Sequence, residues 1–220
     1  MAGLDPAQFS ERLKQVHSRI GELRGRADAV EVIAVTKGFG TDALQLAADH
    51  GLAIGENYAQ ELLSKLASFD NRANVPVHFI GQLQTNKVRS LVDVVDVWQS
   101  VDRTSLIDEL AKRAPGARMF VQVNVSDDAR RGGCAWGDVE TLVHRGRDCG
   151  LDVCGLMTVG LMGQQSQTRS AFRRLVACAQ ELDLVELSIG MSDDWEMAVE
   201  EGATVIRLGR ALFGDRKLSV

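Results

Sequence analysis

A lysine stands where a hydrophobic strand is expected to end. The segment EVIAVTKGFG runs from Glu31 to Gly40, and its strand-like residues Val32 to Thr36 lead directly to Lys37, with no acidic residue beside it. Burial lowers the pKa of an amine, and a neutral amine is the form that attacks a carbonyl carbon. Lys37 is therefore a candidate for Schiff-base chemistry, although most lysines are solvated surface amines.

Two turns near the end of the sequence are candidates for binding an anion. SIGMS (188–192) and RLGRALFG (207–214) each join an expected strand to an expected helix, where backbone N–H groups can bind phosphate. The first turn is followed by Asp193 and Asp194, which would repel a phosphate, whereas the second has no acid and carries Arg210. The second turn is therefore the expected phosphate site, with glycine packing as the alternative reason for its composition.

Arg207 and Gly209 lie at the end of the last expected strand. Because Arg207 and Gly209 are two residues apart, both point to the same side of the strand. Arg207 is therefore expected to face a ligand bound at Gly209. An amine opposite a phosphate site is a more specific combination than either feature alone.

Eight short segments rich in Val and Ile must position these residues. They alternate with segments of helical periodicity, and the expected strands are 32–36, 53–55, 77–80, 95–100, 119–125, 153–158, 185–189 and 205–208. Eight strand–helix units in 220 residues favour an α/β fold with a closed (β/α)8 TIM barrel. An open doubly wound sheet is the alternative, but no G-x-G-x-x-G motif follows an early strand. In a barrel, the strand ends bring Lys37 and both turns to one face.

Helices are expected before the first strand and between later strands. Asp5 can cap the first helix with Pro6 at its first position, and Thr41 is expected to cap the next. Further helices are expected over 58–69, 103–114 and 166–183. Only three prolines occur and no linker divides the chain. Residues 1–220 are therefore predicted to form a single domain, with an extra N-terminal helix in 1–29 packed on the barrel.

Composition excludes several classes of protein. A net charge of −5 and a pI near 5.4 argue against a broad nucleic-acid surface, which needs clustered Lys and Arg. The four cysteines form no C-x-x-C motif, so reduced thiols and no metal site are expected. No stretch of 18 apolar residues and no signal-like segment occur. We therefore expect a cytoplasmic protein without a membrane or nucleic-acid partner.

Several segments together are similar to one known family. AVTKGFG, GENYAQE, HFIGQLQTNK, GLMTVG and SIGMSDDWEMAVEEGATVIRLGRALFG resemble the YggS/PROSC family of pyridoxal phosphate-binding homeostasis proteins, which is related to the N-terminal barrel of alanine racemase. The resemblance covers Val32 to Gly214, nearly the whole chain, and the last segment is long and ordered. It implies a TIM barrel that binds pyridoxal 5'-phosphate.

The resemblance implies a role for individual residues. Lys37 would carry the cofactor as an internal aldimine, and Arg207 would face the pyridine nitrogen. The family's phosphate contacts correspond to Ser188, Gly190, Met191, Gly209 and Arg210, and the residues that would line the ring pocket are Asn57, His78 and Met157. Arg210 is a departure, because relatives often have Thr or Ser there, and the segment VGLMGQQSQTRS is shorter than the family usually shows.

The same residues bear on whether the protein is an enzyme. Enzymes that use pyridoxal phosphate as an electron sink place a carboxylate at the pyridine nitrogen, and an arginine there does the reverse. In the related racemase a tyrosine from another domain faces the lysine, whereas the one tyrosine of this chain is Tyr58. The resemblance therefore implies a non-catalytic carrier or buffer with no catalytic residues, whose partners include pyridoxal phosphate-dependent apo-enzymes. An amino-acid racemase is the alternative, and a colourless Schiff-base aldolase acting on a phosphorylated sugar is a third possibility.

Overall fold

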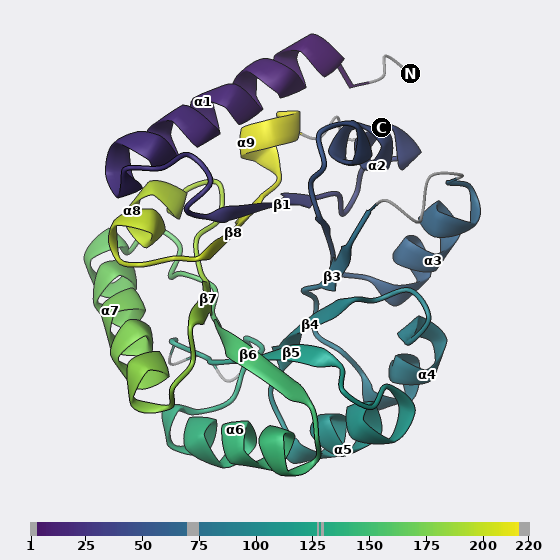
Figure 1. Ribbon diagram of the computed structural model, residues 1–220, viewed down its shortest axis with the longest axis vertical. Helices are drawn as coiled ribbons and strands as arrows, with labels where there is room; N and C mark the ends of the chain where they lie inside the picture. The colour runs from purple at the N-terminus through teal and green to yellow at the C-terminus, as the bar shows by residue number, and fades with distance from the viewer. Residues whose placement is uncertain (1–3, 70–74, 127, 129, 216–220) are drawn as a thin grey trace.

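The computed structural model describes residues 4–69, 75–126, 128 and 130–215. Eight parallel strands close into a barrel in chain order, with β8 pairing back to β1, and helices surround it (Figure 1). The strands are β1 (Glu31–Val35), β2 (Ile54–Glu56), β3 (Val77–Phe79), β4 (Val97–Val101), β5 (Arg118–Gln122), β6 (Asp152–Met157), β7 (Glu186–Ser188) and β8 (Val205–Leu208). The predicted (β/α)8 TIM barrel is confirmed. The termini of the predicted domain, 1–3 and 216–220, lie outside the described residues.

Helices follow the strands around the barrel. They are α1 (Pro6–Arg24), α2 (Thr41–Asp49), α3 (Ala59–Ala67), α4 (Val88–Leu91), α5 (Thr104–Arg113), α6 (Val139–Asp148), α7 (Gln165–Glu181), α8 (Trp195–Glu200) and α9 (Arg210–Phe213), with 3-10 turns at Thr85–Lys87 and Trp136–Asp138. None of the helices in the described part of the chain is long and apolar enough to cross a membrane.

The extra N-terminal helix is present as predicted. Asp5 caps α1 by accepting hydrogen bonds from the backbone N–H groups of Ala7 and Gln8, and Pro6 occupies its first position. Its buried face packs against α8 and α9, so that α1 lies across the outside of β1 and β8 (Figure 1). The helix thus covers the part of the barrel where the first strand pairs with the last.

Two local predictions were wrong. Thr41 begins α2 rather than capping it, because Gly40 takes the extended cap conformation at φ −80° and ψ −169°. The strand expected over 119–125 ends at Gln122. Beyond it, Asn124 donates hydrogen bonds from Nδ2 to the carbonyl oxygens of Asp128 and Arg131. These contacts, together with the isolated pairing of Val123 with Cys134, stabilise the loop that follows the strand.

The barrel interior changes character along its axis. An apolar cluster fills part of it, formed by Ile33, Ala53, Val97, Phe120, Cys154, Met157 and Val205. Polar side chains are buried in the same barrel, and they are His78, Gln99, Ser188 and Arg207. Because buried polar groups are costly unless they form hydrogen bonds, this second set needs hydrogen-bond partners within the protein.

Candidate functional site

Lys37 sits in a tight turn directly after β1. The turn is closed by a hydrogen bond from the backbone N–H of Phe39 to the carbonyl oxygen of Thr36, and Gly38 has a positive φ of 74°. Thr36 points away from the barrel axis toward α3, while Lys37 is half-buried on the turn. The predicted strand–turn position of Lys37 is therefore as the sequence indicated.

Two side chains of α3 form hydrogen bonds with the backbone on either side of Lys37. Lys65 Nζ donates to the carbonyl oxygen of Thr36 at 2.7 Å, and Glu61 Oε1 accepts from the backbone N–H of Gly38 at 2.5 Å. Lys65 and Glu61 are also an ion pair at 2.6 Å. The peptide units flanking Lys37 are therefore fixed from outside the barrel.

A buried glutamate completes this support. Lys65, only 8% exposed, also pairs with the fully buried Glu56 at 2.6 Å, and the Thr36 hydroxyl donates to the same carboxylate oxygen. Burial raises the pKa of Glu56, while the bonds from Lys65 and Thr36 act in the opposite direction. The sequence analysis missed Lys65 and Glu61. Their i, i+4 spacing on a helix was the available signal.

Arg207 lies inside the barrel, as expected from its strand position. Its Nη1 donates to the carbonyl oxygen and hydroxyl of Ser188 at 2.6 and 2.7 Å, and Nη2 donates to the carbonyl oxygen of Thr158 at 2.7 Å. Burial lowers the pKa of Arg207 to about 10, with Asp194 opposing the shift, so the group stays charged at neutral pH. A guanidinium has five N–H donors, and these bonds use three of them.

Ser188 and His78 belong to one buried chain of hydrogen bonds with Gln99. The Ser188 hydroxyl donates to Gln99 Oε1 at 2.7 Å, and Gln99 Nε2 lies 2.8 Å from His78 Nδ1. Burial, with a smaller contribution from Arg118, lowers the pKa of His78 to about 4. His78 and Ser188 were expected at a ring pocket and at a phosphate, and the structure places both beside Gln99, which the sequence analysis did not single out.

The two glycine-containing turns lie next to each other, and their own side chains bind their backbone. Asp194 Oδ1 accepts from the backbone N–H of Met191 at 2.6 Å, and the Ser192 hydroxyl accepts from the N–H of Ala211 at 3.2 Å. Burial raises the pKa of Asp194, with the Met191 N–H and Arg207 opposing. Both N–H groups are of the kind that would bind a phosphate, so an incoming anion would compete with these two side chains.

Arg210 is turned outward. It is more than half exposed and donates to Asp193 at 2.5 Å. The pair neutralises one of the two acids that the sequence analysis expected to repel a phosphate. The helix α9 has only four residues, so any anion binding at this turn depends on individual N–H groups rather than on a helix dipole.

The two glycines of these turns differ in whether a larger residue could take their place. Gly190 has a φ of 95°, and an added Cβ would stand 2.7 Å from the Cβ of Ala198, so folding itself requires glycine there. Gly209 has a negative φ of −106°, and an added Cβ would first meet the carbonyl oxygen of Val35 at 3.5 Å, an ordinary contact. In the described part of the chain, packing therefore leaves room for a Cβ at position 209.

Asn57 and Met157 complete the predicted set. Asn57 directly follows β2, and its Oδ1 is buried without a hydrogen-bond partner among the described residues. An unpartnered buried acceptor is unusual in a folded protein. Met157 ends β6 and belongs to the apolar cluster of the barrel interior. Asn57 therefore has an unused buried acceptor and Met157 an apolar side chain at the strand ends, and their roles at a ligand stay predictions.

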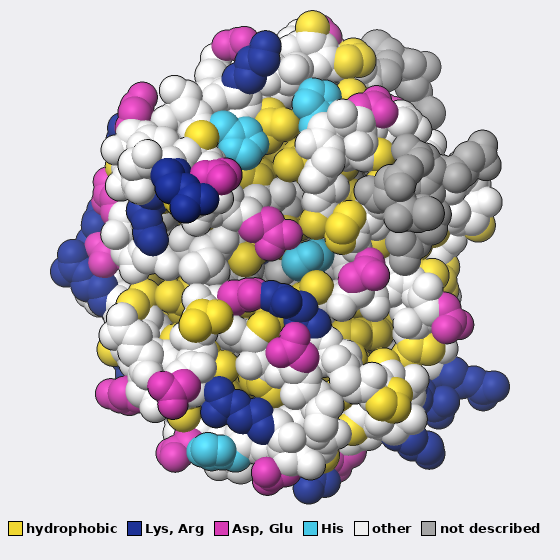
Figure 2. Space-filling view, in the orientation of Figure 1, with side chains coloured by type: hydrophobic (Ala, Val, Ile, Leu, Met, Phe, Trp, Pro, Cys, Tyr) yellow, Lys and Arg dark blue, Asp and Glu magenta, His cyan; other side chains and the backbone are white. Residues whose placement is uncertain are grey.

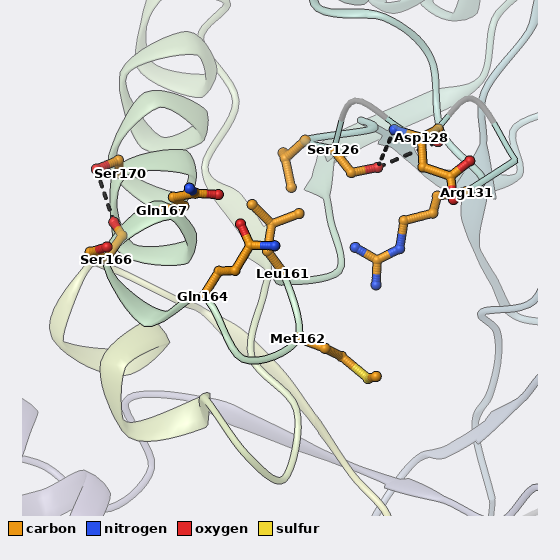
Figure 3. Close-up of a pocket in the computed structure, with 10 residues that line it drawn as sticks. Ser126, Asp128, Arg131, Leu161, Met162, Gln164, Ser166, Gln167 and Ser170 are labelled. Atoms are coloured by element: carbon orange, nitrogen blue, oxygen red, sulfur yellow. Dashed lines mark hydrogen bonds between the residues drawn. The ribbon is translucent and has the colours of Figure 1, made fainter.

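A cavity of about 660 Å³ lies between the loop after β5 and the segment that leads into α7 (Figure 3), and Lys37 is not among its lining residues. In Figure 3 the side chain of Arg131 points toward the loop that carries Leu161 and Met162. Arg131 also borders a smaller cavity of about 170 Å³ at the ends of β5 and β6. The large cavity contains none of the predicted residues, and its lining is Val125, Ser126, Asp128, Arg131, Leu161, Met162, Gln164, Ser166, Gln167 and Ser170.

Comparisons of sequence place this chain among proteins of one kind. The family model for the N-terminal domain of alanine racemase matches residues 12–217. A pyridoxal phosphate homeostasis protein of Pseudomonas aeruginosa is 37% identical over 94% of this chain and 96% of its own length. A protein of the same name from Aquifex aeolicus is 34% identical over 94% of this chain and 98% of its own length.

Comparisons of structure agree. PipY of Synechococcus elongatus, solved with pyridoxal phosphate bound, is 31% identical, with a TM-score of 0.77 over 91% of this chain and all of its own. The alanine racemase of Corynebacterium glutamicum has a TM-score of 0.75 at 15% identity, over 99% of this chain and 63% of its own. The second likeness is one of fold alone.

Proposed function

Because the chain belongs to the family of pyridoxal phosphate homeostasis proteins, we propose that it binds pyridoxal 5'-phosphate covalently and reversibly at Lys37 and acts as a carrier or buffer. The observation that carries the proposal is the braced turn of Lys37 at the mouth of a barrel whose interior holds a buried arginine. Pyridoxal phosphate supplies an aldehyde that condenses with a primary amine and releases water.

The residues present fit this ligand. The two unused N–H donors of Arg207 suit an acceptor atom such as a pyridine nitrogen. The unpartnered Oδ1 of Asn57 suits a donor on the ligand, and Met157 offers an apolar contact to a flat ring. Lys65 and Glu61 would hold the Lys37 turn in place while the amine reacts.

For the phosphate, we propose the turn after β8 as the main contact and the turn after β7 as a secondary wall. The support is the room at Gly209, where glycine is not required by packing. Ser188, Gly190, Met191 and Arg210 complete the proposed set. Asp193 is paired with Arg210, so the charge that would oppose a phosphate from this side is already compensated.

We further propose that the protein is not an amino-acid racemase. An arginine beside the ring nitrogen disfavours protonation of that nitrogen, which an electron sink requires. Tyr58, the one tyrosine of the chain, is 63% exposed at the start of α3. Racemases with such an arginine work with a tyrosine as a second base, so the support for a carrier is the arginine that weakens the electron sink taken together with the exposed position of Tyr58. Apo-enzymes that need pyridoxal phosphate are the proposed recipients.

The test is the visible absorption spectrum of the purified protein before and after borohydride reduction, followed by peptide mapping. The wild-type protein should be yellow, and the reduced pyridoxyl group should be recovered on Lys37. Lys37→Ala should be colourless, while Lys87→Ala serves as a matched lysine control that keeps the colour. A colourless wild type would favour the aldolase alternative, and recovery of the label on Lys87 would contradict the assignment.

Chiral analysis after incubation with L-alanine and other amino acids decides between carrier and racemase. We expect no turnover in the ordinary enzyme range of about 1 per second or more. A saturable rate in that range that disappears in Lys37→Ala would overturn the carrier proposal. Transfer to an apo-enzyme can then be followed by the recovery of that enzyme's activity.

A further inference from the structure

The buried polar chain inside the barrel has a defined direction. It runs from Arg207 through Ser188 and Gln99 to His78, with contacts of 2.7, 2.7 and 2.8 Å. All four side chains are buried. We propose that Gln99 and His78 are positioning residues that hold Arg207 in its ligand-facing orientation through Ser188. The proposal rests on the proposed binding of pyridoxal phosphate.

The direction follows from the arginine at one end. A guanidinium only donates hydrogen bonds, so the Ser188 oxygen must accept from Arg207, and its own proton must go elsewhere. The partner at 2.7 Å is Gln99, which must therefore present its carbonyl oxygen. With the amide turned over, the Ser188 oxygen would accept from both Arg207 and the Gln99 NH2 group, and the buried Ser188 hydroxyl proton would lose its acceptor.

The orientation of Gln99 in turn sets the proton of His78. With its oxygen toward Ser188, Gln99 presents its NH2 group to His78 Nδ1 at 2.8 Å. Nδ1 must then be the acceptor, and the neutral ring carries its proton on Nε2. Nε2 lies 3.8 Å from the carboxylate of Glu31 at the start of β1. Arg118 is the other charged group that acts on the ring. A donor-only group at one end thus fixes a tautomer at the other.

This arrangement would matter to a ligand because the Ser188 hydroxyl is one of three groups that orient the guanidinium. If Gln99 cannot accept, the Ser188 proton has no fixed direction, and one anchor of Arg207 weakens. A residue that merely filled the barrel would act differently, because its replacement would change stability without changing the ring of His78. Gln99 thereby becomes a determinant of binding at the ring nitrogen, although it is placed to act through Arg207.

The first experiment uses the protein without cofactor. Two-bond ¹H–¹⁵N correlation NMR reports histidine tautomers, and the signals of His78 are those lost in His78→Gln. We expect Nε2–H with unprotonated Nδ1 in the wild type. Ser188→Ala, which removes the directing donor, should give a mixture of tautomers. Val97→Ala, two residues before Gln99 and in the apolar cluster of the same interior, should leave the His78 tautomer unchanged. A protonated Nδ1 in the wild type, or no response to Ser188→Ala, would overturn the proposal.

The second experiment measures affinity for pyridoxal 5'-phosphate and for unphosphorylated pyridoxal. Gln99→Leu should weaken both by a similar factor, about three- to tenfold for one lost hydrogen bond, because the effect reaches the ring through Arg207. Val97→Ala should change neither by as much. A loss confined to the phosphorylated ligand would assign Ser188 and Gln99 to the phosphate instead. If the wild type binds neither ligand, the proposed function fails, and the tautomer result still decides separately whether the directed chain exists.

Discussion

The two ends of the barrel use polar side chains in opposite ways. At the end where strands begin, the first residues of β1, β5, β6 and β7 are Glu31, Arg118, Asp152 and Glu186. Arg118 pairs with Glu186 and lies 3.9 Å from Asp152, and Glu31 faces His78. Figure 2 shows acidic, basic and histidine side chains gathered at the centre of one face. This end is closed by charges that compensate one another.

At the end where strands finish, compensated ion pairs of Lys65 and Arg210 are also present, but three other residues there keep unused hydrogen-bonding capacity or space. Asn57 keeps a buried oxygen without a partner among the described residues, Arg207 keeps two donors, and Gly209 keeps space. The charged residues there, Lys65 and Glu61, brace the turn of Lys37 from outside. The contrast is that polar groups at the beginning of the strands are paired with one another, whereas Asn57 and Arg207 at the end keep hydrogen-bonding capacity, which we propose serves a ligand.

Replacing Lys65, which binds the backbone beside Lys37, should have the largest effect on the free energy of unfolding. Lys65→Met leaves the fully buried Glu56 without its cation, and loss of one partner of a buried ion pair costs about 3–5 kcal/mol. Urea unfolding of the apo-protein measures the free energy of unfolding. The double variant Lys65→Met/Glu56→Gln is the control and should recover part of the loss. An effect below about 1 kcal/mol would mean that the cluster is not a support.

Substitution at Gly209 tests the proposed phosphate site directly. The protein has room for a Cβ at position 209, and the larger side chain of Gly209→Val should block the proposed phosphate seat. Two hydrogen bonds to a charged group correspond to about 3 kcal/mol, so the preference for pyridoxal 5'-phosphate over pyridoxal should fall about 100-fold. The ratio of the two dissociation constants measures it.

Arg210→Ala should reduce this preference less than Gly209→Val does, because Arg210 is turned toward Asp193. Removing it also exposes the negative charge of Asp193 to the phosphate. Arg210→Ala/Asp193→Asn is the matched control and should recover part of the lost preference. A full phosphate preference in Gly209→Val would show that the turn after β8 is not the phosphate site.

Lowering the pH should destabilise the protein through His78, which is buried inside the barrel. Its pKa is about 4 when folded and about 6.5 when unfolded, so between these values the unfolded chain binds more protons. Stability from this group is therefore complete above pH 6.5 and is lost as the pH falls toward 4. Between pH 7 and pH 4.5 the wild type should lose about 2 kcal/mol more than His78→Gln. Equal losses in the two proteins, measured by urea unfolding, would contradict a buried neutral ring.

The smallest effect is expected at the end where strands begin. Arg118 is 44% exposed in its side chain, and exposed ion pairs contribute about 0–1 kcal/mol. Arg118→Ala should therefore change the free energy of unfolding by no more than about 1 kcal/mol and leave the affinity for pyridoxal phosphate unchanged. A marked loss of affinity would abolish the distinction between the two ends.

Several features followed from the sequence because they depend on neighbours along the chain. Alternation of Val-rich and helical segments gave the eight strands of the barrel, and Asp5 with Pro6 gave the start of α1. The placement of Lys37 after β1 and of Arg207 within β8 followed from the same local periodicity. The roles of the predicted site residues in binding a ligand stay predictions.

Other features were decided only when the barrel closed. Lys65 meets Thr36 from 29 positions away, and Ser188 meets Gln99 from 89 positions away, so no local pattern could pair them. The same holds for the outward turn of Arg210, which depends on Asp193 in a different loop. Periodicity records which side of an element is buried, but the partner of a buried polar group is chosen by distance in space. The braces of Lys37 and Arg207 were therefore set by tertiary structure.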